Sequence, residues 1–389
     1  MKRVFFPKEI YQIDVIILLL YCTNSLMLLL PLFLKKLGAT PDIVGIYVGI
    51  YFIFTFFSRP IIGWIIDVVN PKRILLTGLI FLSFFVFCYL VVKKLGFFLI
   101  FVRAGQGMSY SSILISLLLL AVIFSDETNR AHVLSILSIF FLLPNLFMPF
   151  IGEWIIEKTG FFLYFMFAFI LCVTALIISS RIKFEWKRTE STKSRNFFSL
   201  IRNSKFLIVS IFSFFLGLGL SSTNTFVPLW IKNFPSVKIG FFFTSAALIA
   251  VLIRFFIGGR FKFWAKGETV LFSFYILGLG IFLTSYARGN PMVIISGLIY
   301  GGGMGFLFPN LLTMAVTEVD EKERGKALSI FTALIDLGFA IGPPISGWFV
   351  ESFGYSEMFR SLSLLMIISS TFLYLIFKKF IKRRSSPFL

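Results

Sequence analysis

The sequence predicts an all-α integral membrane protein, with about 12 transmembrane helices in two pseudo-symmetric six-helix bundles and both termini in the cytoplasm. Three observations predict this fold: the apolar composition, the spacing of the apolar segments, and a repeat within the chain. Of the 389 residues, 58% are hydrophobic and 14% are charged, and the mean hydropathy is +0.94. Soluble domains carry about 25% charged residues. A water-soluble fold could not bury this much apolar surface, so lipid must cover part of it.

The individual helices are predicted from the lengths of the apolar segments. A helix needs about 20 apolar residues to cross the hydrocarbon core, because its backbone groups must all pair within the segment. The segments that meet this requirement lie at about residues 12–34, 42–66, 74–92, 97–124, 132–152, 161–180, 206–230, 240–260, 268–287, 291–316, 327–350 and 359–378. Lys2 and Arg3 precede the first segment without a cleavage site, so we expect a retained helix rather than a signal peptide.

The basic residues predict the orientation of the chain. The net charge is +19, and Lys and Arg lie mainly in the two terminal tails and in alternate loops. This positive-inside pattern predicts cytoplasmic termini. It also argues against a nucleic-acid-binding protein, whose basic residues would form one continuous surface. The longest polar stretch, residues 181–205, is predicted to be a basic cytoplasmic linker between one bundle at 1–180 and a second at 206–389.

A charged phrase occurs twice in this apolar chain. DETNRAHVLSI at 126–136 and DEKERGKALSI at 320–330 share six of their eleven residues at an offset of 194. Residues of rarer types recur at the same offset: Pro149 and Pro343, Trp154 and Trp348, Glu157 and Glu351, Gly160 and Gly354, Phe165 and Phe359. At offset 195 the recurring residues are Gly45 and Gly240, Arg59 and Arg254, Gly63 and Gly258. The two halves are therefore related, and an even number of helices in each gives them the same orientation.

The repeated phrase is predicted to form a capped cytoplasmic turn in each half. Its acidic residues suit the positive end of the helix that follows. Arg130 and Arg324 could bind the carbonyl groups that end the preceding helix. The two turns would then be matched elements of a cytoplasmic gate.

These features resemble the major facilitator superfamily over nearly the whole chain. SRPIIGWIIDVVNPKR at 58–73 resembles the family signature between helices 2 and 3. The matching residues are Gly63, Asp67, Lys72 and Arg73. Val68 replaces the usual basic residue, and Asn70 replaces the usual Gly. The resemblance implies that Asp67 is a gate residue, which ties this loop to the start of helix 11 in the outward-facing state.

A second motif, RAGQG at 103–107, resembles the Arg-x-x-Gln-Gly of family helix 4, whose Arg faces the central cavity. The resemblance implies that Arg103 lines a cavity, and the alternative is a purely structural hydrogen-bonding role. Gln106 lies one turn away on nearly the same face. The equivalent stretch of the second half is GLIYGGGMG at 297–305, where the glycines allow close helix packing. Tyr300 of that stretch is a further candidate cavity residue.

The third motif departs from the family pattern. Drug-exporting members carry a Gly-rich Gly-Pro signature on helix 5, but LLPNLFMPFIG at 142–152 lacks its first glycines. The fuller version is GFAIGPPISGW at 338–348, on helix 11. Residues 28–73 still resemble the drug and metabolite efflux branch most.

Polar side chains inside the apolar segments are candidates for the transport path, because a charge in the membrane must face protein or water. Asp336 could pair with Arg59 during rocking, or it could titrate and couple transport to protons. Asn24 and Asn224 could contact substrate or join helices by hydrogen bonds. The remaining intramembrane charges are Arg254, which is equivalent to Arg59, and Asp14 near the cytoplasmic end of helix 1. Asp14 is expected to be a solvated end charge, and the alternative is a proton carrier.

The residue types exclude several other classes of function. Cys22, Cys88 and Cys172 lie in apolar runs without ligand spacing, and the one histidine, His132, lies in a loop. We therefore expect no enzyme, no metal and no cofactor, with the proton gradient as the energy source. The predicted partners are a small-molecule substrate and the lipid bilayer, and a single chain with both halves could act as a monomer.

The sequence thus predicts a secondary active transporter of a prokaryotic cytoplasmic membrane. The favoured function is proton-coupled efflux of an amphiphilic compound or metabolite by alternating access. One alternative is an uptake or uniport carrier for a sugar-like or organic-anion solute. A further alternative is a lipid-moving protein of the same fold.

Overall fold

The computed structural model describes residues 7–125, 133, 137, 139–184, 203–257, 266–320 and 323–384. All regular elements in these ranges are helices. In the first half they are α1 (Lys8–Leu26), η1 (Met27–Leu29), α2 (Leu30–Lys36), α3 (Pro41–Val68), α4 (Pro71–Cys88), η2 (Tyr89–Val91), α5 (Phe97–Ile123), η3 (Leu143–Leu146), α7 (Met148–Thr159) and α8 (Phe161–Ser180). In the second half they are α10 (Ser204–Ile231), α11 (Gly240–Ile257), α13 (Gly267–Thr284), α14 (Asn290–Thr317), α15 (Arg324–Phe353) and α16 (Tyr355–Arg384).

The helical lengths agree with the predicted membrane spans. Ten helical segments in the described ranges are long and apolar enough to cross a membrane, and Gly240–Phe256 is a shorter apolar helix. The described part of the predicted span 132–152 differs from the prediction. Residues 133, 137, 139 and 140 are helical, and a turn at 141–142 and the short helix η3 then separate them from α7, which continues to Thr159. Pro144 and Pro149 explain the interruption, because proline cannot donate a helical hydrogen bond and fits best in a first helical turn.

The chain divides into two compact units, which are described separately. Unit 1 comprises residues 1–39 and 50–192, and unit 2 comprises residues 40–49 and 193–389. The predicted border between the bundles stays a prediction, since most of the linker 181–205 lies outside the described residues. The division also groups residues 40–49, at the start of α3, with unit 2 rather than with the predicted first bundle.

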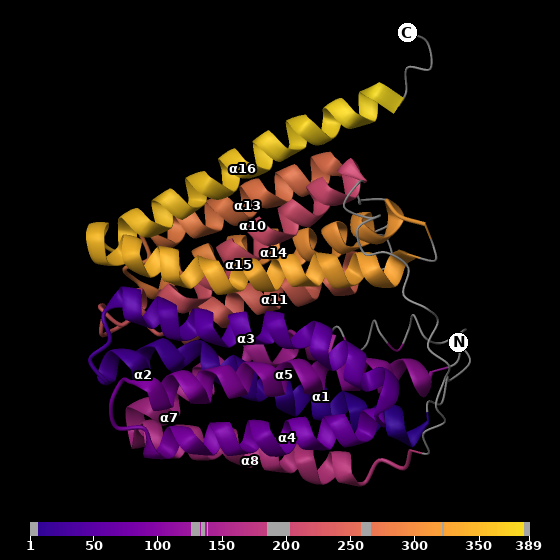
Figure 1. The fold of residues 1–389 in the computed structure, drawn as a ribbon. Helices are drawn as coiled ribbons and strands as arrows, with labels where there is room; N and C mark the ends of the chain where they lie inside the picture. Colours follow the sequence, from indigo (N-terminus) through magenta and orange to yellow (C-terminus); the bar gives the residue numbers. More distant parts are fainter. Residues whose placement is uncertain are drawn as a thin grey trace. The chain divides into compact units, whose positions relative to one another are not determined.

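Within unit 1, α4 lies beside both α5 and α8, and α1 also packs on α8 (Figure 1). Small residues allow the closest approaches. A Cβ atom built on Gly107 of α5 would lie 2.2 Å from the carbonyl oxygen of Tyr51 in α3. A Cβ atom on Gly105 would overlap the ring of Phe85 in α4. Only glycine permits the approach of Gly107 to the backbone of Tyr51, and a larger residue at 105 would have to displace the ring of Phe85.

Within unit 2, α10 packs along α15, and α14 lies against both α11 and α13 (Figure 1). A Cβ atom on Gly217 of α10 would lie 2.2 Å from the carbonyl oxygen of Ile335 in α15. A Cβ atom on Gly301 would lie 2.1 Å from the carbonyl oxygen of Ala246. The glycine-rich stretch of α14 therefore brings helices together, as the sequence predicted.

The internal repeat is visible in local structure. Gly160 and Gly354 occupy equivalent positions and have φ angles of 83° and 85°, a region that favours glycine. Each residue joins two helices, α7 to α8 in unit 1 and α15 to α16 in unit 2. Trp154 and Trp348, also equivalent, are 58% and 59% exposed. The two units share the same local design at this end.

Candidate functional site

Arg103 lies near the start of α5 and is only 4% exposed. Its Nη1 donates a hydrogen bond to Oε1 of Gln106 at 2.9 Å, and the hydroxyl of Tyr89 donates to the same oxygen at 2.9 Å. The guanidinium carbon lies 4.8 Å from the ring centroid of Tyr51, within the range of a cation–π contact. The structure therefore brings together the predicted pair Arg103 and Gln106, and it adds two tyrosines that the sequence did not predict.

A set of aromatic side chains continues from Arg103 toward α1. The rings of Tyr51 and Tyr110 are 5.9 Å apart, and the hydroxyl of Tyr110 donates to that of Tyr21 at 2.8 Å. Tyr21 stacks on Phe141 at 4.7 Å. Asn24, the candidate cavity residue of α1, is half-buried, and its side chain makes no hydrogen bond within the part of the chain that the structure describes.

The equivalent position of unit 2 is neutral. Tyr300 of α14, which lies 194 residues after Gln106, is buried against Phe242, and the two ring centroids are 5.3 Å apart. The hydroxyl of Tyr300 donates to Oδ1 of Asn224 in α10 at 3.2 Å. The interhelical hydrogen bond, one of the two alternatives for Asn224, is therefore present. A role of Asn224 in substrate binding stays a prediction.

The intramembrane carboxylates are buried. Asp336 of α15 is buried, and Asp14 of α1 is 8% exposed. The prediction of Asp14 as a solvated end charge is therefore wrong, because α1 begins earlier than expected and packs this turn inside unit 1. Among the described residues, Oδ1 of Asp14 has no hydrogen-bond partner. Sequence reasoning also missed Glu153 of α7, which is 4% exposed; a single acidic residue in the apolar stretch MPFIGEWII was the available signal.

The intramembrane arginines occupy corresponding positions in the two units. Arg254 of α11 lies over the ring of Phe308 in α14, with its guanidinium carbon 5.9 Å from the ring centroid. Arg59 lies in α3, within unit 1, whereas Asp336 lies within unit 2. The pairing of Arg59 with Asp336 stays a prediction.

The loop between α3 and α4 has a defined local structure. Oδ1 of Asn70 accepts a hydrogen bond from the backbone N–H of Lys72 at 2.8 Å, so this departure from the family motif caps α4. Nζ of Lys72 donates to the carbonyl oxygens of Ser180 and Ile182, at 3.0 and 2.6 Å. This contact satisfies carbonyl groups at the end of α8, where a cation is favoured.

The other predicted gate residues lie in α3, α4 and α15 or outside the described residues. Gly63 lies in α3, and a Cβ atom built on it would meet no described atom within 4 Å. Arg73 is exposed, and Arg324 is the exposed first residue of α15. The backbone of Asp67 belongs to α3, but its side chain lies outside what the structure describes, as does all of Arg130. The gate assignment of these residues stays a prediction.

Comparison with known proteins shows the class of protein. A model of the Major Facilitator Superfamily matches residues 15–266 and also residues 234–387. The chain therefore belongs to this superfamily of transporters, and it is a multi-pass membrane protein.

Curated relatives resemble the chain over most of its length. The staphylopine export protein of Staphylococcus aureus is 22% identical over 92% of this chain and 93% of its own length. An uncharacterized MFS-type transporter of Methanocaldococcus jannaschii is 20% identical over 89% of this chain and 92% of its own length. A transporter of this type from Salmonella typhimurium is 26% identical over 42% of each chain. These relatives indicate the cytoplasmic membrane of a prokaryote, as the sequence predicted.

Solved structures share the fold at low sequence identity. The nucleoside transporter NupG has a TM-score of 0.77 at 15% identity, covering 97% of this chain and 100% of its own. A bacterial homolog of the human lysosomal transporter Spinster has a TM-score of 0.79 at 14% identity, covering 98% of both chains. At these identities the likeness shows the fold alone. The predicted fold of two related helical bundles is confirmed.

Proposed function

We propose that this protein exports a small organic metabolite by secondary active transport, with alternating access and coupling to proton flow. One observation carries the direction of transport: the resemblance to the staphylopine export protein extends through nearly all of both chains. Membership of the superfamily supports transport of a small molecule in general. The substrate class and the coupling are argued from the residues of each unit.

The substrate is proposed to carry an anionic group that meets Arg103. Gln106 and Tyr51, which are both uncharged, hold the guanidinium of Arg103 in one place. A positive charge held in a poorly solvated position attracts an anion more strongly than it would in water. Asn24 is assigned to a polar group of the same substrate, since its amide is half-buried and accessible.

Proton coupling is assigned to Asp336. A buried carboxylate in an apolar helix is costly when charged, so gain and loss of a proton can accompany a change of conformation. Asp14, buried in unit 1, is a second carboxylate with the same property. The pairing of Arg59 with Asp336 in one state is compatible with this role.

The test is transport by the purified protein in liposomes that contain a pH-sensitive dye, with a panel of small organic compounds and an imposed pH gradient. A transported compound should change the internal pH in the wild type but not in Asp336→Asn. Glu357→Gln is the matched control, because Glu357 is an exposed carboxylate near the start of α16. Undiminished proton flux in Asp336→Asn would refute the coupling role, and substrate movement independent of pH would favour a uniport carrier.

A further inference from the structure

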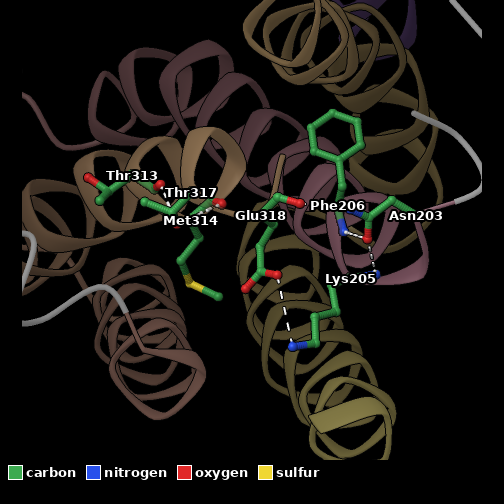
Figure 2. Close-up of polar contacts among 7 residues, drawn as sticks. All are labelled: Asn203, Lys205, Phe206, Thr313, Met314, Thr317 and Glu318. Atoms are coloured by element: carbon green, nitrogen blue, oxygen red, sulfur yellow. Dashed lines mark hydrogen bonds and ion pairs between the residues drawn. The ribbon is translucent and has the colours of Figure 1, made fainter. Parts of the chain in front are cut away.

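Two helix ends of opposite polarity meet in unit 2. Helix α14 ends at Thr317, and Glu318 is its C-cap residue. Helix α10 begins at Ser204, and Asn203 is its N-cap residue. Figure 2 shows the side chain of Asn203 close to both ends. The carbonyl groups at a helix C-terminus and the N–H groups at an N-terminus lack partners within their own helices, so each end needs one from elsewhere.

One amide side chain serves both ends. Oδ1 of Asn203 accepts hydrogen bonds from the backbone N–H groups of Lys205 and Phe206, at 3.2 and 3.3 Å. Nδ2 of Asn203 donates to the backbone carbonyl oxygen of Glu318 at 2.7 Å. Asp or Ser could cap α10 equally well. A carboxylate cannot donate, and a serine hydroxyl has one oxygen for both roles, whereas an amide has an acceptor and a donor on separate atoms, so the residue type suits the bridge and not merely the cap.

A charged contact crosses the same two ends. Nζ of Lys205 lies 4.0 Å from Oε2 of Glu318, and both side chains are partly exposed (Figure 2). Exposed ion pairs add little stability. The bond between Asn203 and Glu318 is also only part-buried, so water can replace either partner when it breaks. Both contacts are therefore easily reversible.

The body of α14 is held by close contacts with neighbouring backbones. Gly301 and Gly303 lie directly against the backbones of α11 and α13, where a Cβ atom would meet Ala246 or Leu277 at 2.1 or 2.5 Å. Pro309 lies inside the helix, between this packed part and Glu318. Because proline lacks an N–H group, the helical hydrogen bond at this point is missing, which is a common cause of helix bending.

We propose that Asn203 is a reversible latch on the last turns of α14, with Pro309 as the point at which the helix bends when the latch opens. The latch holds the end of α14 to the start of α10 in the conformation described here, and it opens during the transport cycle. An intramolecular hydrogen bond of this kind shifts an equilibrium by roughly 2- to 13-fold. That strength suits a switch, because a much stronger contact would hold one state permanently.

The first test is hydrogen–deuterium exchange of the full-length protein in lipid nanodiscs without substrate. Asn203→Asp keeps an acceptor for the cap of α10 but loses the donor to Glu318. We expect exchange in residues 311–318 to rise roughly 2- to 13-fold, with no change in residues 293–305. Asn203→Ser should act in the same way. Asn233→Asp, an exposed substitution of the same charge beyond the other end of α10, should leave both segments unchanged.

Unchanged exchange in residues 311–318 of Asn203→Asp would overturn the latch. A uniform rise throughout unit 2, with a matching loss of thermal stability, would also overturn it, because the contact would then be part of the general fold. Glu318→Gln separates the two contacts, since it removes the ion pair and keeps the carbonyl acceptor. We expect it to change exchange less than Asn203→Asp does.

The role of the latch in transport rests on the proposed function and needs a separate measurement. In the liposome assay, Asn203→Asp should change the maximal rate more than the Michaelis constant, because it alters a conformational step rather than a substrate contact. Faster exchange with unchanged transport kinetics would refute this role. Failure of the wild-type protein to move any compound would instead count against the proposed function.

Discussion

Gln106 has a single side-chain oxygen, and two donors from different helices converge on it. The bonds from Tyr89 and Arg103 use both lone pairs of that oxygen. All three side chains are buried, so none can exchange its partner for bulk water. A substitution of Gln106 should therefore affect both the stability of unit 1 and the position of the charged Arg103 side chain.

Gln106→Leu should lower the free energy of unfolding by about 2 kcal/mol or more, because it removes the acceptor that two buried donors share. Tyr89→Phe removes one donor and leaves the bond from Arg103, so its effect should be smaller. Gln106→Glu keeps an acceptor and should stay close to the wild type in stability. Thermal unfolding in detergent measures all three. Equal stability of Gln106→Leu and the wild type would contradict the geometry described here.

Lys72 gives a second prediction at the scale of single residues. Lys72→Met should fray the end of α8, because the carbonyl groups of Ser180 and Ile182 lose their donor. The expected cost is about 0.5–1 kcal/mol, measured as faster hydrogen exchange in residues 176–182. The control is Arg73→Met, because Arg73 is exposed and this substitution removes one positive charge, as Lys72→Met does. An equal effect of both substitutions would show that charge alone, and not this contact, holds the loop.

The elements show how much the sequence could predict. Ten spans and the cluster of glycines in α14 followed from apolar length and residue type, because these signals are local. The position of Arg103 and Gln106 on the same helix face could be predicted from their spacing of three residues. Tyr89 was not predictable, because it reaches Gln106 only through the packing of separate helices. The solvated state expected for Asp14 was wrong for the same reason, since burial depends on neighbours that are distant in the sequence.

Adjacent glycines of α14 give a prediction at the scale of elements. Gly303→Ala would place a Cβ atom 2.5 Å from the backbone nitrogen of Leu277, so α14 and α13 must separate. We expect a loss of at least about 2 kcal/mol in stability. Gly302→Ala meets only the side chain of Ile276 at 3.8 Å and should be neutral or stabilising by up to about 1 kcal/mol. Unfolding midpoints in detergent compare the two, and equal destabilisation would show that α14 is not packed as described.

The whole molecule consists of two units that repeat one local design with different chemistry. The cap glycines are equivalent, whereas the position of Gln106, bonded to a cation in unit 1, is occupied in unit 2 by Tyr300, bonded to a neutral amide. Shared structural residues reflect what every copy of the bundle requires to fold. The differing residues are the ones free to specialise, which is why the proposed anion contact belongs to unit 1 alone.

Because the two units share their structural residues, substitution of equivalent glycines should lower stability equally. Substitution of residues that differ between the units should affect transport unequally. Gly160 and Gly354 both combine a positive φ with an extended ψ, of −174° and 167°, a conformation essentially restricted to glycine. Gly160→Ala and Gly354→Ala should each cost about 1–3 kcal/mol, because a Cβ atom is strained there whatever the surrounding space. Neither residue has a described neighbour within 4 Å of such an atom, so packing cannot cause the loss.

Thermal unfolding of the two variants should show similar shifts, while the liposome assay should show similar maximal rates per folded molecule. A large shift in one variant and none in the other would mean that the two turns are not equivalent. The repeat would then be present in the sequence but not in the local structure.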